Sequence, residues 1–341
     1  MSTTGRLFCL LPLALLSSCN DQGSYPQQLE LTGATMGTTF SVSIILSEQA
    51  VDTRELEQDI NVALQNIEKS MSTYAADSEL SRFNQHKSTT WVPASIALCD
   101  AIAQSLEIAK FTGGSFDITV GPLVNLWGFG PTGTGDEPPS EAEVKQVRRH
   151  VGFEKLSTDC AASRIRKSDE KVYVDLSAYA KGLAVDKLAD ILQARGVRNF
   201  LAEIGGEIRL QGVNRSASPW RIAIEKPIND GRSVERIIQI TEGAVATSGD
   251  YRNFIDYNGK RYSHAINPHT GTPVSHKLAS VTVIDEKAAL ADALATALFV
   301  MGPEQGPRFA EQHSIAALFL IYGPTNVSEH MSPGFEKLLT R

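Results

Sequence analysis

The chain has 341 residues, a mass of 36.9 kDa and a formal net charge of −7, with 42% hydrophobic and 21% charged residues. This is the composition of an ordinary globular protein, which excludes a disordered chain and a multispan membrane protein. An acidic chain without a run of Lys and Arg also lacks the basic patch that nucleic-acid phosphates require, so we expect no nucleic-acid partner.

The first 18 residues are typical of an export signal. Arg6 precedes an apolar run over residues 7–16, which is shorter than the roughly 20 residues that span a bilayer. Small residues then precede Cys19, and this pattern resembles a bacterial lipobox, whose cysteine carries the lipid. The alternative is a plain signal peptide with an incidental cysteine. The resemblance implies a signal peptide over 1–18, a lipidated linker over 19–28 and a protein anchored on the periplasmic side. Asp21 is similar to inner-membrane retention signals.

Two cysteines remain in the folded body once Cys9 is removed with the signal and Cys19 is lipidated. Cys99 and Cys160 could pair in an oxidising compartment, but their sequence separation does not say whether they are close in space. A disulfide and two free thiols therefore both stay open.

The folded body, residues 29–341, is predicted to be one domain with strands and helices mixed along the chain. Alternating apolar residues predict a strand at 40–46, and helical spacing predicts helices at 56–67 and 95–111. The further predicted elements are a loop over 128–139, a capping box of Ser140 with Glu143, a hairpin over 164–176, a helix ending at Gly196, strands at 200–204, 208–210, 220–224, 237–240 and 280–284, a helix at 288–301 and a strand at 316–322. Strands that cluster in this way favour an α+β fold, with mixed or antiparallel sheets flanked by helices.

Asp175 and Lys181 lie where a strand is followed by a helix. Backbone N–H groups at a helix start attract anions, and a bound phosphate would offset the unfavourable position of a cation there. The competing interpretation is an exposed lysine and an ordinary N-terminal helix acid.

Asp292 and Thr296 are four residues apart in a nearly all-apolar helix, so they share one buried face. A lone buried carboxylate is costly, and Mg²⁺ suits a carboxylate with a neutral oxygen when phosphate oxygens complete the shell. A hydrogen bond to backbone or an arginine would satisfy the carboxylate equally well.

Two further segments could serve chemistry. His264 is predicted on a strand that runs into an Asn-Pro turn, where its imidazole could act as a base, although a structural histidine is commoner. Ser115, Phe116 and Asp117 follow Gly113-Gly114, where small residues let a ligand approach the backbone; turn glycines with core aromatics are the alternative.

Taken in order, these segments resemble the ApbE family of flavin transferases. The resemblance runs from about residue 32 to residue 320 and is carried by six blocks: Ala34-Thr-Met36-Gly-Thr, Met71-Ser-Thr-Tyr74 with Ser78-Glu-Leu-Ser-Arg-Phe-Asn84, Phe116-Asp-Ile-Thr-Val-Gly-Pro-Leu-Val, Asp175-Leu-Ser with Lys181-Gly, Ser263-His-Ala-Ile-Asn-Pro with Thr270-Gly, and Ala291-Asp-Ala-Leu-Ala-Thr-Ala.

The resemblance implies an enzyme that binds FAD and Mg²⁺ and transfers FMN from FAD to a Thr or Ser hydroxyl of a target flavoprotein, with release of AMP. Typical targets are subunits of membrane redox pumps of the Nqr and Rnf type. The implied FAD-contact residues are Met36, Tyr74, Ser115, Phe116, Asp117, Asp175, Lys181 and Ile266. The implied magnesium ligands are the Ala178 carbonyl, Asp292 and Thr296, and the implied catalytic residues are His264 as base and Lys181.

Two other functions compete with transfer. An FAD pyrophosphatase would use water in place of the acceptor hydroxyl, and the motifs barely separate the two because they describe the FAD site. A non-catalytic FAD-binding lipoprotein would need no metal, which leaves Asp292 and Thr296 unexplained.

Overall fold

The computed structural model describes residues 26–46, 52–133, 137–227, 234–249, 254–323 and 326–339. The predicted signal peptide, Cys19 and most of the predicted linker lie outside these residues, so they stay predictions. Within the described part of the chain, no helix is long and apolar enough to cross a membrane.

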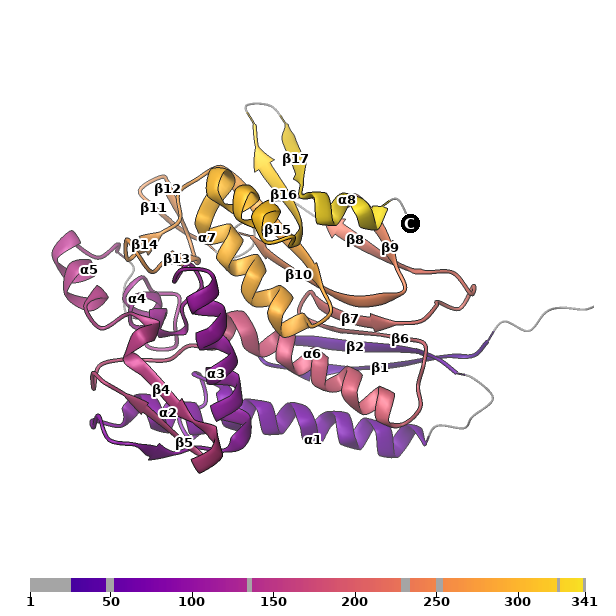
Figure 1. The fold of residues 1–341 in the computed structure, drawn as a ribbon, viewed down its shortest axis with the longest axis horizontal. Helices are drawn as coiled ribbons and strands as arrows, with labels where there is room; N and C mark the ends of the chain where they lie inside the picture. Colours follow the sequence, from indigo (N-terminus) through magenta and orange to yellow (C-terminus); the bar gives the residue numbers. More distant parts are fainter. Residues whose placement is uncertain are drawn as a thin grey trace, which may run out of the picture.

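An eight-stranded sheet runs through the centre of the molecule (Figure 1). Its strands, in spatial order, are β1 (Gln28–Thr35), β2 (Thr38–Ile45), β6 (Phe200–Ile204), β7 (Glu207–Gln211), β10 (Glu242–Gly249), β15 (Leu278–Asp285), β16 (Ala316–Tyr322) and β17 (Val327–Met331). Every neighbouring pair is antiparallel. This sheet and its covering helices confirm the predicted α+β class.

Among the described residues, four smaller antiparallel sheets accompany the central one. They are β3 (Val92–Pro93) with β5 (Arg164–Lys167) and β4 (Leu156–Asp159), β8 (Trp220–Glu225) with β9 (Val234–Ile240), β11 (Phe254–Tyr257) with β12 (Lys260–Ser263), and β13 (Ile266–Asn267) with β14 (Thr272–Pro273). The α-helices are α1 (Thr53–Met71), α2 (Glu79–Gln85), α3 (Ile96–Phe111), α4 (Gly121–Leu126), α5 (Glu141–Arg148), α6 (Ser177–Ala194), α7 (Ala288–Gln312) and α8 (Pro333–Leu339). Three 3₁₀ turns are η1 (Ile118–Val120), η2 (Phe153–Lys155) and η3 (Cys160–Ala162).

Both faces of the central sheet are covered, as β16 illustrates. Ala317 and Phe319 pack into the core beneath α7, whereas Leu318 and Leu320 pack with the β8–β9 hairpin and α8. Successive side chains of a strand point to opposite faces, so this alternation defines a helical layer and a hairpin layer. Helices α1 and α6 extend the helical layer over β1, β2 and β6 (Figure 1).

Helices α6 and α7 are fixed against each other by two residues. A Cβ on Gly182 would lie 2.4 Å from the Ala288 carbonyl oxygen, so only glycine allows this close approach. Four residues further on, the buried Asp186 carboxylate accepts the N–H groups of Ala288 and Ala289, each at 3.0 Å, and so caps α7 from the neighbouring helix. This contact brings Lys181 of α6 beside Asp292 of α7.

The predicted hairpin over 164–176 is wrong. Its first strand, β5, pairs instead with β4 and β3. Residues 172–175 form no strand, because the Asn84 side chain donates to the Val174 carbonyl at 2.8 Å and accepts the Val174 N–H at 2.7 Å. An amide side chain therefore takes the place of a strand neighbour, which the local pattern of apolar residues could not reveal.

Two other features differ from or complete the sequence prediction. The helix predicted at 288–301 is longer in the structure, where α7 runs to Gln312. The backbone departs from helical geometry at Gly302, with φ of +80°, and a second helical stretch follows directly. Cys99 and Cys160 form a disulfide with Cα atoms 5.6 Å apart, so the question of their pairing is resolved. The disulfide ties α3 to η3.

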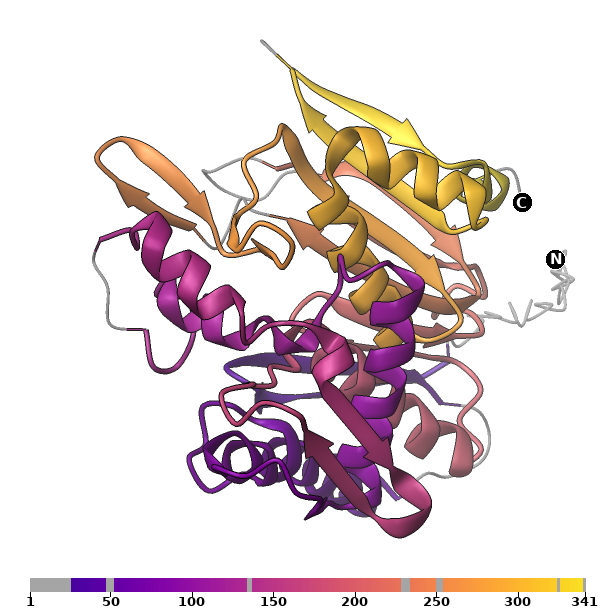
Figure 2. The same cartoon turned by 60° about the vertical axis from the view of Figure 1, so that its left-hand side comes forward.

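A small lobe gathers at one end of the molecule, where α4, α5 and the hairpins β11–β12 and β13–β14 lie together (Figures 1 and 2). It has a core of its own around Leu123, Val144 and Ile266. The Trp127 indole N–H donates to the Gly271 carbonyl at 2.9 Å and joins α4 to the turn after β13. The lobe faces the helical layer across the cavity described next.

Candidate functional site

A cavity of about 970 Å³ lies between the small lobe, α6, α7 and strands β7 and β10. Nearly all the site residues predicted from the sequence line it. They are Tyr74, Ser115, Phe116, Asp117, Asp175, Ala178, Lys181, His264, Ile266, Asp292 and Thr296. Segments more than 200 residues apart in sequence therefore meet at one site. Of the predicted FAD, metal and catalytic residues, Met36 alone is not among those that line it.

Three charged side chains meet at the base of this cavity. The Lys181 ammonium lies 2.6 Å from Glu207 Oε1 and 3.9 Å from Asp292 Oδ2. The two carboxylate side chains are only 4% and 5% exposed. Burial raises the pKa of Glu207 to about 8 and also raises the pKa of Asp292. Burial opposes the charged form of Lys181, but Asp292 and Glu207 outweigh it and raise the pKa of that lysine.

The raised pKa values of Glu207 and Asp292 mean that the trio lacks the additional positive charge that would let both acids ionise. Two carboxylates face one ammonium, and Glu207 Oε2 is buried without a hydrogen-bond partner among the described residues. A buried acceptor left unpaired is expensive, so the arrangement favours an additional cation or donor in the cavity.

Oxygen donors of the kind that Mg²⁺ prefers surround the trio. Thr296 lies one helical turn after Asp292, and its hydroxyl is 2.9 Å from the Ser248 hydroxyl. On the facing helix, α6 departs from helical geometry at Ala178, with φ of −89° and ψ of 19°. The Gly182 N–H, which would bond to the Ala178 carbonyl in a regular helix, has Asp292 Oδ2 at 3.4 Å.

No group of three or more His, Cys, Asp or Glu that could hold a metal exists among the described residues. That finding excludes an all-protein cage of acids there, but Mg²⁺ commonly binds one or two carboxylates and completes its shell with water and phosphate oxygens. The carboxylate, hydroxyl and carbonyl donors at this site fit such an ion, and the orphaned Glu207 oxygen agrees with it.

The loop with Ser115, Phe116 and Asp117 forms one wall of the cavity. Phe116 is buried at 2% exposure. Asp117 Oδ1 accepts from the N–H and hydroxyl of Thr119 at 2.8 and 2.6 Å, and Oδ2 accepts the Phe153 N–H at 2.9 Å. Burial raises the pKa of Asp117 against these bonds. This carboxylate holds the loop in shape, so it is a poor candidate for the base.

Asp175 shapes the entry to α6. Its carboxylate accepts the Ser177 N–H at 2.9 Å and the Ser177 hydroxyl at 2.5 Å. The structural role considered for this residue, an acid at a helix start, is therefore present. Asp175 also lines the cavity, so the same position can face a ligand.

His264 lies in the short link between β12 and β13 rather than on a strand as predicted. Its ring centroid is 6.4 Å from that of Phe129, in an edge-to-face arrangement from the small lobe. Ile266, two residues on, is buried in the lobe core. The imidazole lines the same cavity as Lys181 and Asp292, which belong to the helical layer.

Tyr74 and Met36 occupy different surroundings. Tyr74 follows α1, is 70% exposed and lines the cavity, so its ring is accessible to a planar ligand. Met36 occupies the β1–β2 turn with φ of +51°, and its N–H donates to Glu68 Oε1 at 2.6 Å. The role of Met36 at a flavin stays a prediction.

Sequence reasoning missed Glu207. The signal lay in Ile204-Gly-Gly-Glu207, where a turn with φ of +56° at Gly205 and +101° at Gly206 places an acid at the start of a central strand. Glu207 and Arg209 are two residues apart and both buried, so they share one face of β7. Two charged residues on the same face of a central strand, directly after a Gly-Gly turn, indicate a buried polar site on that face of the sheet.

A cavity of about 970 Å³ has the size of a binding site for a large ligand, and its carboxylate and hydroxyl oxygens suit a cation bound with that ligand. A model of the ApbE family matches residues 36–319. FAD:protein FMN transferase of Vibrio cholerae is 43% identical over 335 residues, 98% of this chain and 99% of that protein. The protein of the same name from Haemophilus influenzae is 39% identical over 315 residues, 91% of each chain.

A solved structure agrees with these sequence comparisons. Flavin Transferase ApbE from Vibrio cholerae superposes with a TM-score of 0.85 at 44% identity, covering 92% of this chain and 100% of that one. The chain belongs to the ApbE family, as its six motif blocks had indicated.

Proposed function

We propose that this chain is an FAD:protein FMN transferase that moves FMN from FAD to a hydroxyl of a target protein. One observation carries the proposal: a single cavity is lined by the trio of Lys181, Glu207 and Asp292, which favours a bound cation, by an accessible aromatic ring and by an imidazole. Relatives that match over nearly the whole chain bear this activity in their names.

The chemistry follows from the placement of the residues. The acceptor hydroxyl attacks the FMN phosphorus, an oxygen–phosphorus bond to AMP breaks, and AMP leaves. His264 accepts the proton of that hydroxyl, because it lines the same cavity as Lys181 and Asp292. Lys181, held by Glu207, faces the charge that develops on the pyrophosphate.

Asp292, Thr296 and the Ala178 carbonyl would hold Mg²⁺. That ion would neutralise charge on the two phosphates and on the leaving oxygen. Tyr74 offers its exposed ring to the isoalloxazine, and Phe116 and Ile266 supply apolar contacts along the cavity.

The acceptors we propose are subunits of membrane redox complexes of the Nqr or Rnf type, met at the periplasmic face of the inner membrane through a lipid on Cys19. The disulfide between Cys99 and Cys160 supports export, because such bonds persist in oxidising compartments and are rare in reducing ones.

A product analysis tests the proposed function. The protein is incubated with FAD and Mg²⁺, with and without a redox-pump subunit of the Nqr type, and AMP, free FMN and protein-bound FMN are measured. Transfer predicts AMP and bound FMN in equal amounts, dependent on the subunit. AMP with free FMN alone would identify a pyrophosphatase, and no AMP at all would identify a flavin-binding protein without catalysis.

A further inference from the structure

A second cavity, of about 450 Å³, opens beside the first. It is bounded by α5, η2, the loop before Ser115 and the turn after β13, and Asp117 and Pro268 line both cavities. Anything bound in the second cavity therefore lies next to the ligand in the first.

The second cavity is basic although the chain as a whole is acidic. Lys145 and Arg148 come from α5, Arg149 follows it, and Lys155 comes from η2. The acids that line the cavity are Asp117 and Glu154. Four cations therefore face two acids, of which Asp117 is buried and accepts three hydrogen bonds from neutral donors.

Three of these four cations have no acidic partner within the described part of the chain. Lys155 has Glu154 at 3.8 Å, and Arg148 donates to the His269 carbonyl, which carries no charge. Neither Lys145 nor Arg149 forms an ion pair with any described residue. The side chains of Lys145, Arg148 and Arg149 are exposed. This exposure favours a partner that binds on the surface over a ligand enclosed by the protein.

The position of this basic cavity suits a protein partner. The proposed transfer requires a macromolecule to bring its hydroxyl into the first cavity, so that macromolecule must cover the surface next to it. A cluster of cations at this border, most of them without an acidic partner, attracts acidic side chains, speeds encounter and fixes orientation.

We propose that Lys145, Arg148, Arg149 and Lys155 form a docking site for an acidic surface segment of the acceptor protein. The inference rests on the proposed function, since it assumes that the acceptor is a protein. A free anion such as inorganic phosphate could meet the same cations, and the test below separates the two.

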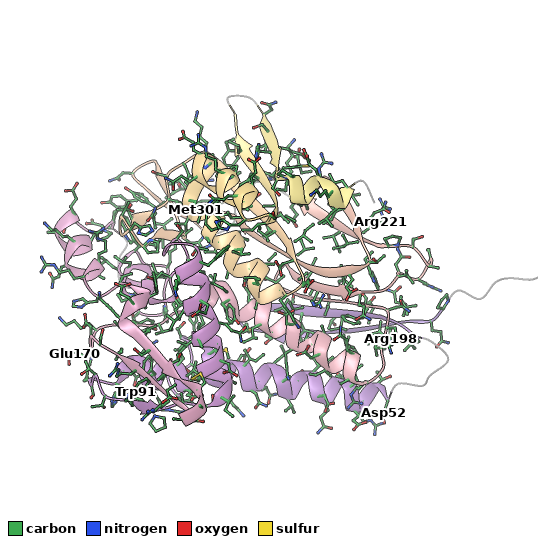
Figure 3. The ribbon with its side chains drawn as sticks, in the orientation of Figure 1. Asp52, Trp91, Glu170, Arg198, Arg221 and Met301 are labelled. Atoms are coloured by element: carbon green, nitrogen blue, oxygen red, sulfur yellow. A yellow bond between two sulfur atoms is a disulfide. The ribbon has the colours of Figure 1, made fainter. Side chains whose placement is uncertain are left out.

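The test compares two double variants with equal changes of charge. Lys145→Glu with Arg149→Glu reverses the two exposed cations that lack ion-pair partners. Arg198→Glu with Arg221→Glu is the control, because these exposed arginines lie at the end of the molecule opposite α5 (Figures 1 and 3). The probe is an Nqr-type subunit whose acceptor threonine is replaced by valine, so that binding is measured without turnover.

The dissociation constant of this probe is measured at 50 and 300 mM NaCl, as is that of FAD. We expect Lys145→Glu/Arg149→Glu to weaken binding of the probe by about tenfold or more at low salt, with the control and the FAD affinity unchanged. The difference should shrink at 300 mM NaCl because salt screens exposed charges.

Equal loss in both double variants, or none in either, would overturn the docking site. Weaker FAD binding in Lys145→Glu/Arg149→Glu would also overturn it, since part of FAD would then occupy the basic cavity. The probe could bind the wild type and both double variants with equal affinity, while inorganic phosphate binds the wild type and not Lys145→Glu/Arg149→Glu. That result would overturn the docking site and assign the cavity to a small anion. If the wild type releases no AMP from FAD, the proposed function is contradicted. The comparison of probe binding between the two double variants would still be valid.

Discussion

The charges of Lys181, Glu207 and Asp292 favour a binding role for this cavity over a structural one. Burying two carboxylates beside one ammonium is unfavourable by itself, and replacing such a group with apolar residues often stabilises a protein. Nothing in the packing of α6 on α7 requires these charges, because Gly182 and Asp186 already fix the two helices. The trio is therefore explained by what it binds.

His264 is the residue we expect to take the proton. His264→Ala should leave FAD affinity unchanged and lower FMN transfer by roughly 10²–10⁴-fold, the usual contribution of a positioned base. The transfer rate of the wild type should decrease in acid, where the base is protonated, and this decrease should be absent in the variant. A variant with normal FAD affinity and a normal rate would remove His264 from the mechanism.

Lys167 provides a pH test of the fold away from the site. Its side chain is 1% exposed, and its ammonium donates to the carbonyls of Phe83, Asn84 and Val172 at 3.2–3.3 Å. Burial lowers the pKa of Lys167 from 10.5 to about 8. Between these two values the unfolded chain keeps a proton that the folded protein has lost, so the free energy of unfolding rises with pH.

The comparison with Lys167→Met isolates this effect, because all other titrating groups are shared. From pH 8 to pH 10.5, the unfolding free energy of the wild type should rise relative to the variant by at most about 3 kcal/mol. Denaturant titrations across that window measure it. Parallel pH curves for the two proteins would show that the lysine keeps its ordinary pKa.

At the scale of elements, the contact of α6 with α7 sets the geometry of the site. Gly182→Ala would be stabilising by about 1 kcal/mol if helix propensity alone mattered. The new methyl group would instead meet the Ala288 carbonyl oxygen, so we expect a loss of roughly 1–3 kcal/mol and slower transfer as Lys181 moves from Asp292. Thermal unfolding decides between the two, since a melting temperature above the wild-type value contradicts the close contact.

The elements with strong local patterns were predictable from the sequence. Helical spacing located α1 and α3, and alternation located β2, because one face of each is buried. Apolar segments also located β6, β7, β8, β9, β15 and β16, whereas β1, β10 and β17 were not predicted. The hairpin over 164–176 was mispredicted because the partner of Val174 is the side chain of Asn84, 90 residues away in sequence. The extension of α7 was missed because Gly302-Pro303 signals an end rather than a break.

The candidate site was predictable where its residues lie in motifs. Asp292 and Thr296 stood out because an acid and a hydroxyl share the face of an apolar helix. Glu207 was missed because its partner Lys181 belongs to another element, and only the fold brings the two within 2.6 Å. The second, basic cavity was equally hidden, since its four cations come from two elements and the chain as a whole is acidic.

At the scale of the whole molecule, the proposed lipid on Cys19 determines where the enzyme meets its acceptor. Cys19→Ser should shift the protein from the membrane fraction to the soluble periplasmic fraction, because that thiol is the one attachment point proposed. Fractionation followed by immunoblotting measures the shift. An unchanged membrane fraction for the variant would contradict the lipoprotein assignment.

The central claim is that this cavity transfers FMN with a cation held by Asp292 and Thr296. The most direct measurement is the intact mass of an Nqr-type acceptor subunit after incubation with FAD and the wild type or Asp292→Ala, across a series of Mg²⁺ concentrations and in EDTA. We predict one added FMN phosphoester with the wild type and Mg²⁺, and none in EDTA or with Asp292→Ala, while circular dichroism shows both proteins folded. Full attachment of FMN in EDTA, or by Asp292→Ala, would contradict the account.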